Sequence, residues 1–141
     1  MVKFRTMLVH ADAMQQKLRA VNEIDGPMFK LAADPRITRV GAFLRKTSLD
    51  ELPQLLNVLK GEMSLVGPRP LAMREMTLDP HWRDARLSVK PGITGLWQVY
   101  GRRSPNFHSW IVLDLDYVRR RSLALDLKLL LMTAASLFKG V

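Results

Sequence analysis

The stretch TSLDELPQLLNVLKGEMSLVGPRP, residues 47–70, carries the strongest structural signals in the chain. Four leucines in it recur at i, i+3, i+4 and i+7, the spacing of one face of a helix: Leu52, Leu55, Leu56 and Leu59. Gly61 follows them, and glycine at a helix C-terminus adopts the left-handed conformation without steric cost. We therefore predict a helix that ends at Gly61 and leads into a constrained loop at 63–70.

Two starting points for this helix are compatible with the sequence. Ser48 and Glu51 have the spacing of a capping box, which favours a start at Ser48. Pro53 lacks an N–H and is tolerated only in a first turn. A start at Asp50 satisfies the proline, whereas a start at Ser48 requires a distorted first turn. Both starts place Asp50 and Glu51 at the beginning of the helix.

Hydrophobic spacing and turn residues predict the remaining elements on both sides of this stretch. Helices are expected at 9–22, from Arg36 onward, within 71–88 with a break at Asp79-Pro80, at 107–120 and at 123–138. A turn is expected at 90–95, and extended segments are expected at 28–31 and, as a strand, at 96–101. We predict a single domain over residues 1–141 in the α+β class, predominantly α-helical, with a few short extended segments and long ordered loops.

The composition indicates a folded, basic protein. Of the 141 residues, 48% are hydrophobic, which excludes a disordered chain, and no cysteine is present for a disulfide or a thiolate metal site. The formal charge of +9 favours an anionic partner such as nucleic acid, a membrane surface or a phosphorylated substrate. A basic surface without any such partner is equally compatible with these counts.

The adjacent acids Asp50 and Glu51 are candidates for two different chemical roles. Neighbouring side chains on a helix point about 100° apart, so one carboxylate can face a reacting phosphorus while the other holds a divalent cation. Arg45 precedes them by five positions, and Arg69 lies between two prolines that restrict its backbone. The alternative is an ordinary solvent-facing helix start beside a rigid turn with a solvated arginine. The residues by themselves leave both interpretations open.

Four segments, in this order, resemble the bacterial sugar transferase family of polyprenyl-phosphate hexose-1-phosphate transferases. They are KFRTM at 3–7, the long segment 25–70 that begins DGPMFKLAADPRITRV, KPGITGLWQVYGR at 90–102 and DLDYVRRRSLALDLKLL at 114–130. Together they extend over most of the chain, which makes the resemblance far more specific than any isolated motif.

The resemblance implies a reaction and a set of site residues. Asp50 would attack the sugar-linked phosphate of a nucleotide-sugar, a UDP-hexose, and release UMP. Polyprenyl phosphate would then accept the sugar phosphate from the aspartyl intermediate, which initiates exopolysaccharide, capsule or O-antigen synthesis. Glu51 would help to coordinate Mg²⁺. The basic positions around the phosphates would be Lys3, Arg45 and Arg69, with Arg102 in the GRR sequence as a less certain addition.

The resemblance also implies a membrane location, at the cytoplasmic face of the bacterial inner membrane. Family members carry a membrane-inserted helix before KFRTM, so we expect the chain to be a catalytic domain without that helix, peripheral or soluble. The last helix, preceded by basic residues, either lies at a lipid interface or packs into the core. The alternative function is a non-catalytic basic module that binds anionic membrane or nucleic acid, or an inactive fragment of the enzyme. No recognised nucleic-acid motif supports a nucleic-acid partner.

Overall fold

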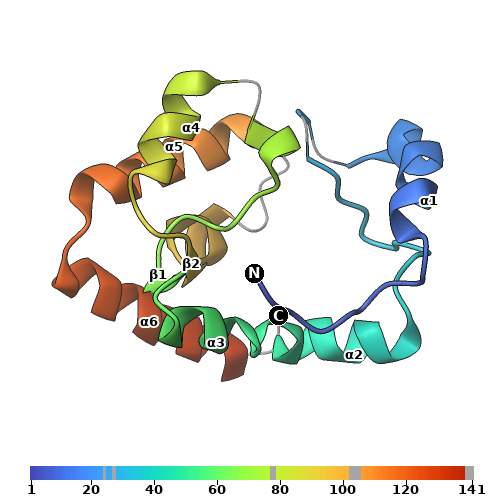
Figure 1. The fold of residues 1–141 in the computed structure, drawn as a ribbon, viewed down its shortest axis with the longest axis horizontal. Helices are drawn as coiled ribbons and strands as arrows, with labels where there is room; N and C mark the ends of the chain where they lie inside the picture. Colours follow the sequence, from blue (N-terminus) through green and yellow to red (C-terminus); the bar gives the residue numbers. More distant parts are fainter. Residues whose placement is uncertain (24, 27, 77–78, 102–105, 139–141) are drawn as a thin grey trace.

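The computed structural model describes residues 1–141 except 24, 27, 77–78, 102–105 and 139–141. Its architecture is α+β and predominantly helical, as predicted (Figure 1). The elements in chain order are α1 (Ala11–Leu18), η1 (Arg19–Val21), α2 (Arg39–Lys46), η2 (Leu49–Glu51), α3 (Gln54–Leu59), β1 (Ser64–Val66), η3 (Met73–Met76), α4 (Pro80–Leu87), β2 (Gly92–Thr94), η4 (Trp97–Gly101), α5 (Phe107–Arg120) and α6 (Leu123–Phe138).

A two-stranded parallel sheet of β1 and β2 lies at the centre of the fold (Figure 1). Ser64 pairs with Gly92 and Val66 pairs with Thr94. Any side chain at position 92 would overlap the backbone of the neighbouring strand, so only glycine allows this close approach. The sequence predicted a loop at 63–70 and a turn at 90–95, and both predictions were wrong where the strands form.

Two hydrophobic clusters lie on either side of α5. The first joins α4, α5 and the segment after Gly26, through Met28, Met76, Trp82, Phe107 and Trp110. The second joins the sheet to α5 and α6, through Val66, Leu96, Tyr117 and Leu129. Because α5 contributes to both clusters, it is the element that connects the upper helices of Figure 1 to the sheet.

The segment before α1 runs along α2 and the start of η2 (Figure 1). Thr38 N–H donates to the carbonyl of Thr6, and the N–H of Phe4 donates to the carbonyl of Asp50. Gly41, on α2, lies directly against Thr6, and a Cβ there would overlap the Thr6 carbonyl. The glycine therefore allows the N-terminal segment to pass close to α2.

The turn that contains the two acids is distorted, and the capping box predicted at Ser48 and Glu51 does not form, because Ser48 makes no side-chain cap hydrogen bond. Ser48 has a left-handed backbone with φ 57°, and residues Leu49–Glu51 form a 3₁₀ turn before α3 begins after Pro53. The leucines of α3 face solvent, with Leu59 84% exposed, and the buried residues of this helix are Gln54 and Asn57. The helix has one apolar and one polar face, and it is the polar face that packs against the rest of the molecule.

Several predicted elements agree with the structure, and one more predicted element, besides those at 63–70 and 90–95, was wrong. The helices at 107–120 and 123–138 have the predicted bounds, and Gly61 has φ +75° after α3. Asp79 caps α4 with Pro80 in its first turn, at the predicted break. The predicted strand at 96–101 was wrong, because Trp97–Gly101 form a π-helical turn in which the Trp97 ring packs against Trp110, with 3.6 Å between ring centroids and 50° between ring planes.

Candidate active site

Asp50 lies almost fully buried beneath the side chain of Lys3. Only 4% of Asp50 is exposed, and its Oδ2 is 3.2 Å from the Lys3 ammonium. Two backbone contacts fix Lys3 in this position: Val2 N–H donates to Asn57 Oδ1, and Phe4 N–H donates to the Asp50 carbonyl. These contacts between the N-terminal segment and the 3₁₀ turn place the Lys3 ammonium next to the Asp50 carboxylate.

Glu51 is paired with a different cation, Arg69. The Glu51 Oε1 and the Arg69 Nη1 are 3.3 Å apart, and both side chains are partly exposed. The neighbouring acids therefore point in different directions and contact cations from opposite parts of the sequence. Adjacent side chains on a helical turn point in different directions, which lets the two carboxylates contact different cations.

A small cavity of about 20 Å³ lies between these groups. Its lining includes Lys3, Glu51, Gln54 and Arg69, together with the backbone of β2 at Gly92. This space holds at most a water molecule. Lys3 and Arg69 border this space with side chains that are 32% and 34% exposed, and each forms an ion pair with one of the two carboxylates.

The backbone of Arg69 is anchored to the hydrophobic interior. Arg86 donates through Nη2 to the Arg69 carbonyl, and the Gly92 N–H donates to the carbonyl of Pro68. Arg86 is itself buried, 3.4 Å from Asp114 and stacked over Trp82 at 4.8 Å. The Pro-Arg-Pro segment is therefore held at both sides, as its two prolines led us to expect.

Asp114 supports this anchor from α5. Its Oδ2 accepts a hydrogen bond from Trp82 Nε1 at 3.3 Å in addition to its ion pair with Arg86. Burial raises the pKa of Asp114 to about 6, although the nearby Arg86 opposes that rise. The same burial lowers the pKa of Arg86. The charge state of Asp114 thus bears on the guanidinium group that positions Arg69.

The other two predicted basic residues are placed differently. Arg45 donates through Nε to Thr6 Oγ1 at 2.9 Å, so in this arrangement it braces the N-terminal segment that carries Lys3. Arg102 lies outside the described residues. The structure therefore brings together Lys3, Asp50, Glu51 and Arg69. Arg45 contacts Thr6 of the N-terminal segment instead of either acid.

Sequence reasoning missed two polar residues of α3. Gln54 lines the cavity and is buried, and Asn57 bonds both the Val2 N–H and the Glu62 carboxylate. Glu51, Gln54 and Asn57 recur every three residues, on the side of the helix opposite the leucines. This polar stripe was the available signal, and it marks the face of α3 directed toward the site.

The structure offers a divalent cation the Glu51 carboxylate in the cavity rather than a complete protein cage. Within the part of the chain that the structure describes, no three His, Cys, Asp or Glu side chains form a metal-binding cluster. Mg²⁺ in phosphate-handling proteins is commonly held by one or two carboxylates, with substrate phosphates and water completing its shell. Glu51 fits that donor set, whereas the Asp50 carboxylate points in a different direction, toward Lys3.

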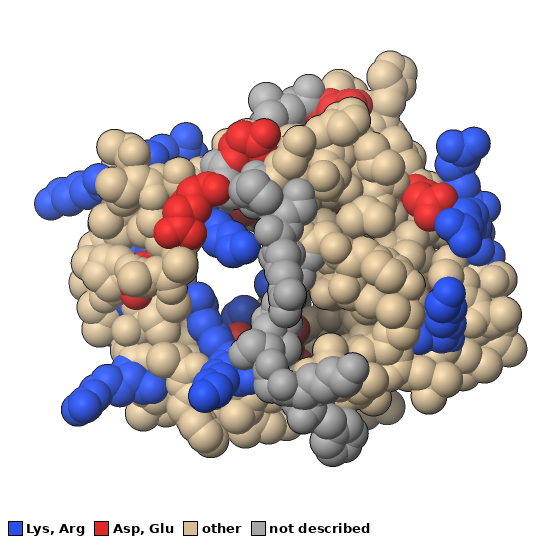
Figure 2. Space-filling view, turned by 180° about the vertical axis from the view of Figure 1, so that it is seen from behind, with Lys and Arg blue, Asp and Glu red and all other residues tan. Residues whose placement is uncertain are grey.

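Basic side chains also surround a hollow on one face of the molecule. Figure 2 shows Lys and Arg side chains bordering a hollow beside the part of the chain that contains α1 and α2, with Asp and Glu side chains also on its rim. Such a surface attracts anions over several ångströms. It agrees with the net charge of +9 and with a phosphorylated ligand.

Comparison with known proteins identifies related sequences over nearly the whole chain. The model of the family described as bacterial sugar transferase matches residues 1–140. A galactosyl transferase of Streptococcus agalactiae is 48% identical over 98% of this chain. The undecaprenyl-phosphate galactose phosphotransferase of Salmonella typhimurium is 47% identical over 94% of the chain. The UDP-glucose:undecaprenyl-phosphate glucose-1-phosphate transferase of Xanthomonas campestris is 46% identical over 95%. The chain spans 31%, 29% and 27% of the lengths of these three relatives.

Proposed function

Because the chain belongs to the bacterial sugar transferase family, we propose that it transfers a hexose-1-phosphate from a UDP-hexose to polyprenyl phosphate. The names of the Salmonella and Xanthomonas relatives support the lipid acceptor, and the Xanthomonas name supports a UDP-sugar donor. The proposed product is the lipid-linked sugar that begins exopolysaccharide, capsule or O-antigen synthesis.

One observation carries this proposal. Two adjacent carboxylates, Asp50 and Glu51, are each paired with a separate cation, Lys3 and Arg69, that comes from a distant part of the sequence. In a solvent-facing helix start, Asp50 would be exposed, and it is instead among the most buried polar residues. A buried acid beside two partly exposed cations is suited to receive an anionic substrate.

The proposed reaction has two displacements at phosphorus. An Asp50 carboxylate oxygen attacks the phosphorus next to the sugar, and the bond to the bridging oxygen breaks as UMP leaves with that oxygen. An oxygen of polyprenyl phosphate then attacks the same phosphorus, which releases the Asp50 carboxylate and forms the lipid-linked sugar diphosphate. Lys3, Arg45 and Arg69 would contact the phosphate oxygens and offset their negative charge.

Glu51 is the residue that we propose to hold Mg²⁺. When bound, the cation would neutralise charge on the diphosphate of the donor. Glu51 suits this role because its carboxylate lines the cavity and is only partly covered by Arg69. Asp50, covered by Lys3, would remain available for attack once that lysine moves to the phosphates.

We also propose that the chain works at a membrane surface, on the cytoplasmic face of the bacterial inner membrane. Exposed leucines on α3 and α6 lie on helices that run along one edge of the molecule (Figure 1): Leu52, Leu55, Leu56, Leu59, Leu123, Leu127 and Leu131. Apolar side chains gathered in this way are typical of surfaces that meet lipid or protein. Among the described residues, no helix is both long and apolar enough to cross a membrane.

Substitution of Asp50 by Asn tests the proposed nucleophile. We expect the parent chain, incubated with Mg²⁺ and UDP-hexose, to gain the mass of one hexose phosphate in intact-mass spectrometry. Polyprenyl phosphate should then remove that mass. Asp50→Asn should show neither step, since an amide is a far weaker nucleophile.

The matched control is Asp84→Asn, an exposed acid on α4 that should keep the adduct. Labelling of the Asp50→Asn chain at the parent level would assign the nucleophile to another residue. A parent chain that transfers sugar phosphate without ever carrying the adduct would contradict the covalent route.

A further inference from the structure

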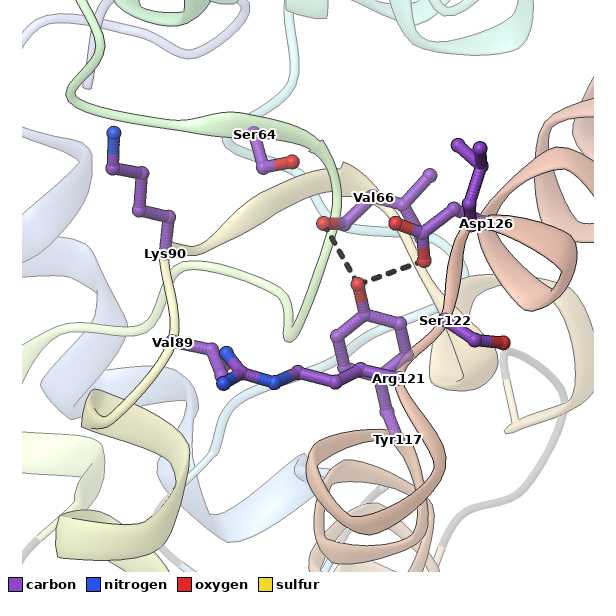
Figure 3. A pocket seen from close by; sticks show the side chains of 9 residues that line it. Ser64, Val66, Val89, Lys90, Tyr117, Arg121, Ser122 and Asp126 are labelled. Atoms are coloured by element: carbon purple, nitrogen blue, oxygen red, sulfur yellow. Dashed lines mark hydrogen bonds between the residues drawn. The ribbon is translucent and has the colours of Figure 1, made fainter.

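A second and larger cavity, of about 350 Å³, lies at the junction of α5 and α6 (Figure 3). Polar side chains from both helices and from the segments around β1 and β2 line it: Ser64, Lys90, Tyr117, Arg121, Ser122 and Asp126. The described residues that line this pocket and those that line the cavity at the acids do not overlap. The proposed transfer reaction uses none of these six side chains.

Two cations of this pocket lack a protein counterion. Among the described residues, neither Lys90 nor Arg121 takes part in an ion pair. In Figure 3 the Arg121 guanidinium lies on the side of the pocket away from Asp126, whereas the Lys90 ammonium points away from that guanidinium and lies 3.7 Å from where a Cβ at Gly61 would be. Arg121 is therefore the cation available to an anion in this pocket, and its planar guanidinium is well matched to phosphate oxygens.

The opposite side of the pocket offers an acceptor. Tyr117 O–H lies 2.9 Å from Asp126 Oδ1 and 3.1 Å from the carbonyl of Val66. Those contacts hold the Asp126 carboxylate in place, and its other oxygen remains free to accept from a ligand. The pocket therefore pairs a cationic side with an acceptor side, which a bare phosphate would not need.

The pocket borders the apolar surface that we propose to meet the membrane. Leu123 lines the pocket and begins an exposed row on α6 that continues through Leu127 and Leu131, the last of which is 72% exposed. On the strand side, Ser64 of the lining is followed by the exposed Leu65. Phosphate at this border would sit where lipid headgroups lie when the leucines contact acyl chains.

We propose that this pocket binds the phosphate of a phospholipid headgroup that also carries an ammonium N–H donor, as phosphoethanolamine does. Arg121 contacts the phosphate, and Asp126 accepts from the headgroup ammonium. The lipid source rests on the proposed membrane contact, whereas the recognition of a phosphate with a donor rests on the pocket alone.

Soluble headgroups test the recognition separately from the membrane. The chain, labelled with ¹⁵N, is titrated with glycerophosphoethanolamine, glycerophosphocholine and inorganic phosphate, and the amide shifts of Ser122 and Leu123 are followed. We expect glycerophosphoethanolamine to bind at least about tenfold more tightly than the other two, since the choline group has no hydrogen-bond donor. Equal affinity for all three, or no shift with any of them, would overturn the proposal.

Matched variants locate the site. Arg121→Gln should weaken glycerophosphoethanolamine binding about tenfold. Arg119→Gln, which removes the same charge from α5 outside the pocket, and Lys90→Gln, whose ammonium points away from Arg121, should each leave it unchanged. Asp126→Asn should keep phosphate contact and lose the preference for ethanolamine over choline. An equal effect of Arg119→Gln would show a diffuse charge effect and contradict the pocket.

Vesicle flotation then tests the lipid source. Phosphatidylcholine vesicles with added phosphatidylethanolamine should retain more of the parent chain than phosphatidylcholine alone, and Arg121→Gln should abolish that gain. A gain that persists in Arg121→Gln would remove the pocket from lipid binding. Asp50→Asn should still bind headgroups, so failure of the proposed transfer reaction and failure of this inference give different results.

Discussion

The Arg69 guanidinium donates to the Glu51 carboxylate. Hydrogen bonds to the carbonyls of Pro68 and Arg69 hold the backbone at this position. A guanidinium can contact two oxygens of one phosphate at a fixed geometry, whereas a lysine ammonium acts as a point charge. Arg69→Lys should therefore keep the charge and lower kcat/KM for the UDP-hexose by about tenfold to a hundredfold, which corresponds to about 1.4–3 kcal/mol. Initial rates at varied donor concentration measure this loss.

The control for that substitution is Arg83→Lys on the exposed side of α4. It removes a guanidinium from a surface ion pair, so kcat/KM should remain at the parent value. Unchanged kinetics in Arg69→Lys would mean that Arg69 contributes charge only, or that it does not contact the donor.

Asp114 should make the stability of the chain depend on pH. Its pKa is raised from 3.8 to about 6 in the folded chain, so the folded state binds this proton more tightly than the unfolded state. The resulting contribution to the free energy of unfolding is fully present below about pH 4 and is lost as the pH rises through 6. The loss amounts to roughly 3 kcal/mol when Asp114 is fully ionised.

Urea unfolding of the parent chain and of Asp114→Asn at several pH values between 4.5 and 7 measures this dependence. The parent should lose stability relative to the variant as the pH increases, because asparagine does not ionise. Two curves that stay parallel over this range would show that the ion pair with Arg86 compensates fully for the buried charge.

Individual site residues differ in how far the sequence could place them. The acids and Arg69 were predicted from their local setting, since Asp50 and Glu51 are adjacent and Pro68 and Pro70 flank the arginine. The contact of Lys3 with Asp50 depends on backbone hydrogen bonds between segments about 50 residues apart, which no local pattern reveals. Their chemical roles remain predictions that the proposed experiments test.

Helices and strands were predictable to different degrees. The long helices α5 and α6 follow from hydrophobic spacing over 14 and 16 residues, which is a strong signal. The strands β1 and β2 have three residues each and pair across a connection that contains α4, so their pairing is a long-range property. At 96–101, Trp, Val and Tyr favour a strand locally, but packing of Trp97 against Trp110 stabilises a helical turn instead.

The orientation of α3 also lay beyond the sequence pattern. Spacing of its leucines predicted the helix, and a helix with one apolar face normally turns that face to the core. Here Gln54 and Asn57 face inward because they bond and cover the N-terminal segment and the site. An inverted helix of this kind indicates that its leucines serve an external contact.

The passage of the N-terminal segment over α2 yields a prediction at Gly41. A methyl group there would overlap the Thr6 carbonyl, so Gly41→Ala must push the segment away or distort α2. We expect a loss of about 1–3 kcal/mol in the free energy of unfolding, despite the better helix propensity of alanine. Chemical denaturation measures it.

A matched comparison is Ala42→Gly at the next, exposed position of α2. It should cost no more than about 1 kcal/mol, from helix propensity alone. If Gly41→Ala stabilised the chain instead, the close approach of Thr6 to α2 would be wrong.

The distribution of apolar and polar surface over the molecule is uneven. The exposed leucines of α3 and α6 occupy the edge opposite α4 in Figure 1. Leu59→Ser should leave the fold intact, because the side chain is exposed, and should weaken binding to lipid vesicles by tenfold or more. Burying one leucine contributes about 1.5–3 kcal/mol, which corresponds to that factor.

The control for vesicle binding is Leu87→Ser, which removes a leucine that is 57% exposed from α4, on the other side of the molecule. Sedimentation with vesicles should give the parent value for this variant. Equal losses in the two variants would indicate nonspecific hydrophobic binding and would contradict a membrane-facing edge.

The extent of the chain as one domain over residues 1–141 stays a prediction.

The anchor from Trp82 through Arg86 to Arg69 ties the proposed site to the buried side chain of Trp82, of which only 1% is exposed. A substitution at Trp82, far from any bound substrate, would consequently register first as a catalytic defect and only under harsher conditions as unfolding. Genetic screens for loss of polysaccharide would then return interior tryptophan alleles alongside those of the acids, and thermal inactivation would precede loss of helical circular dichroism.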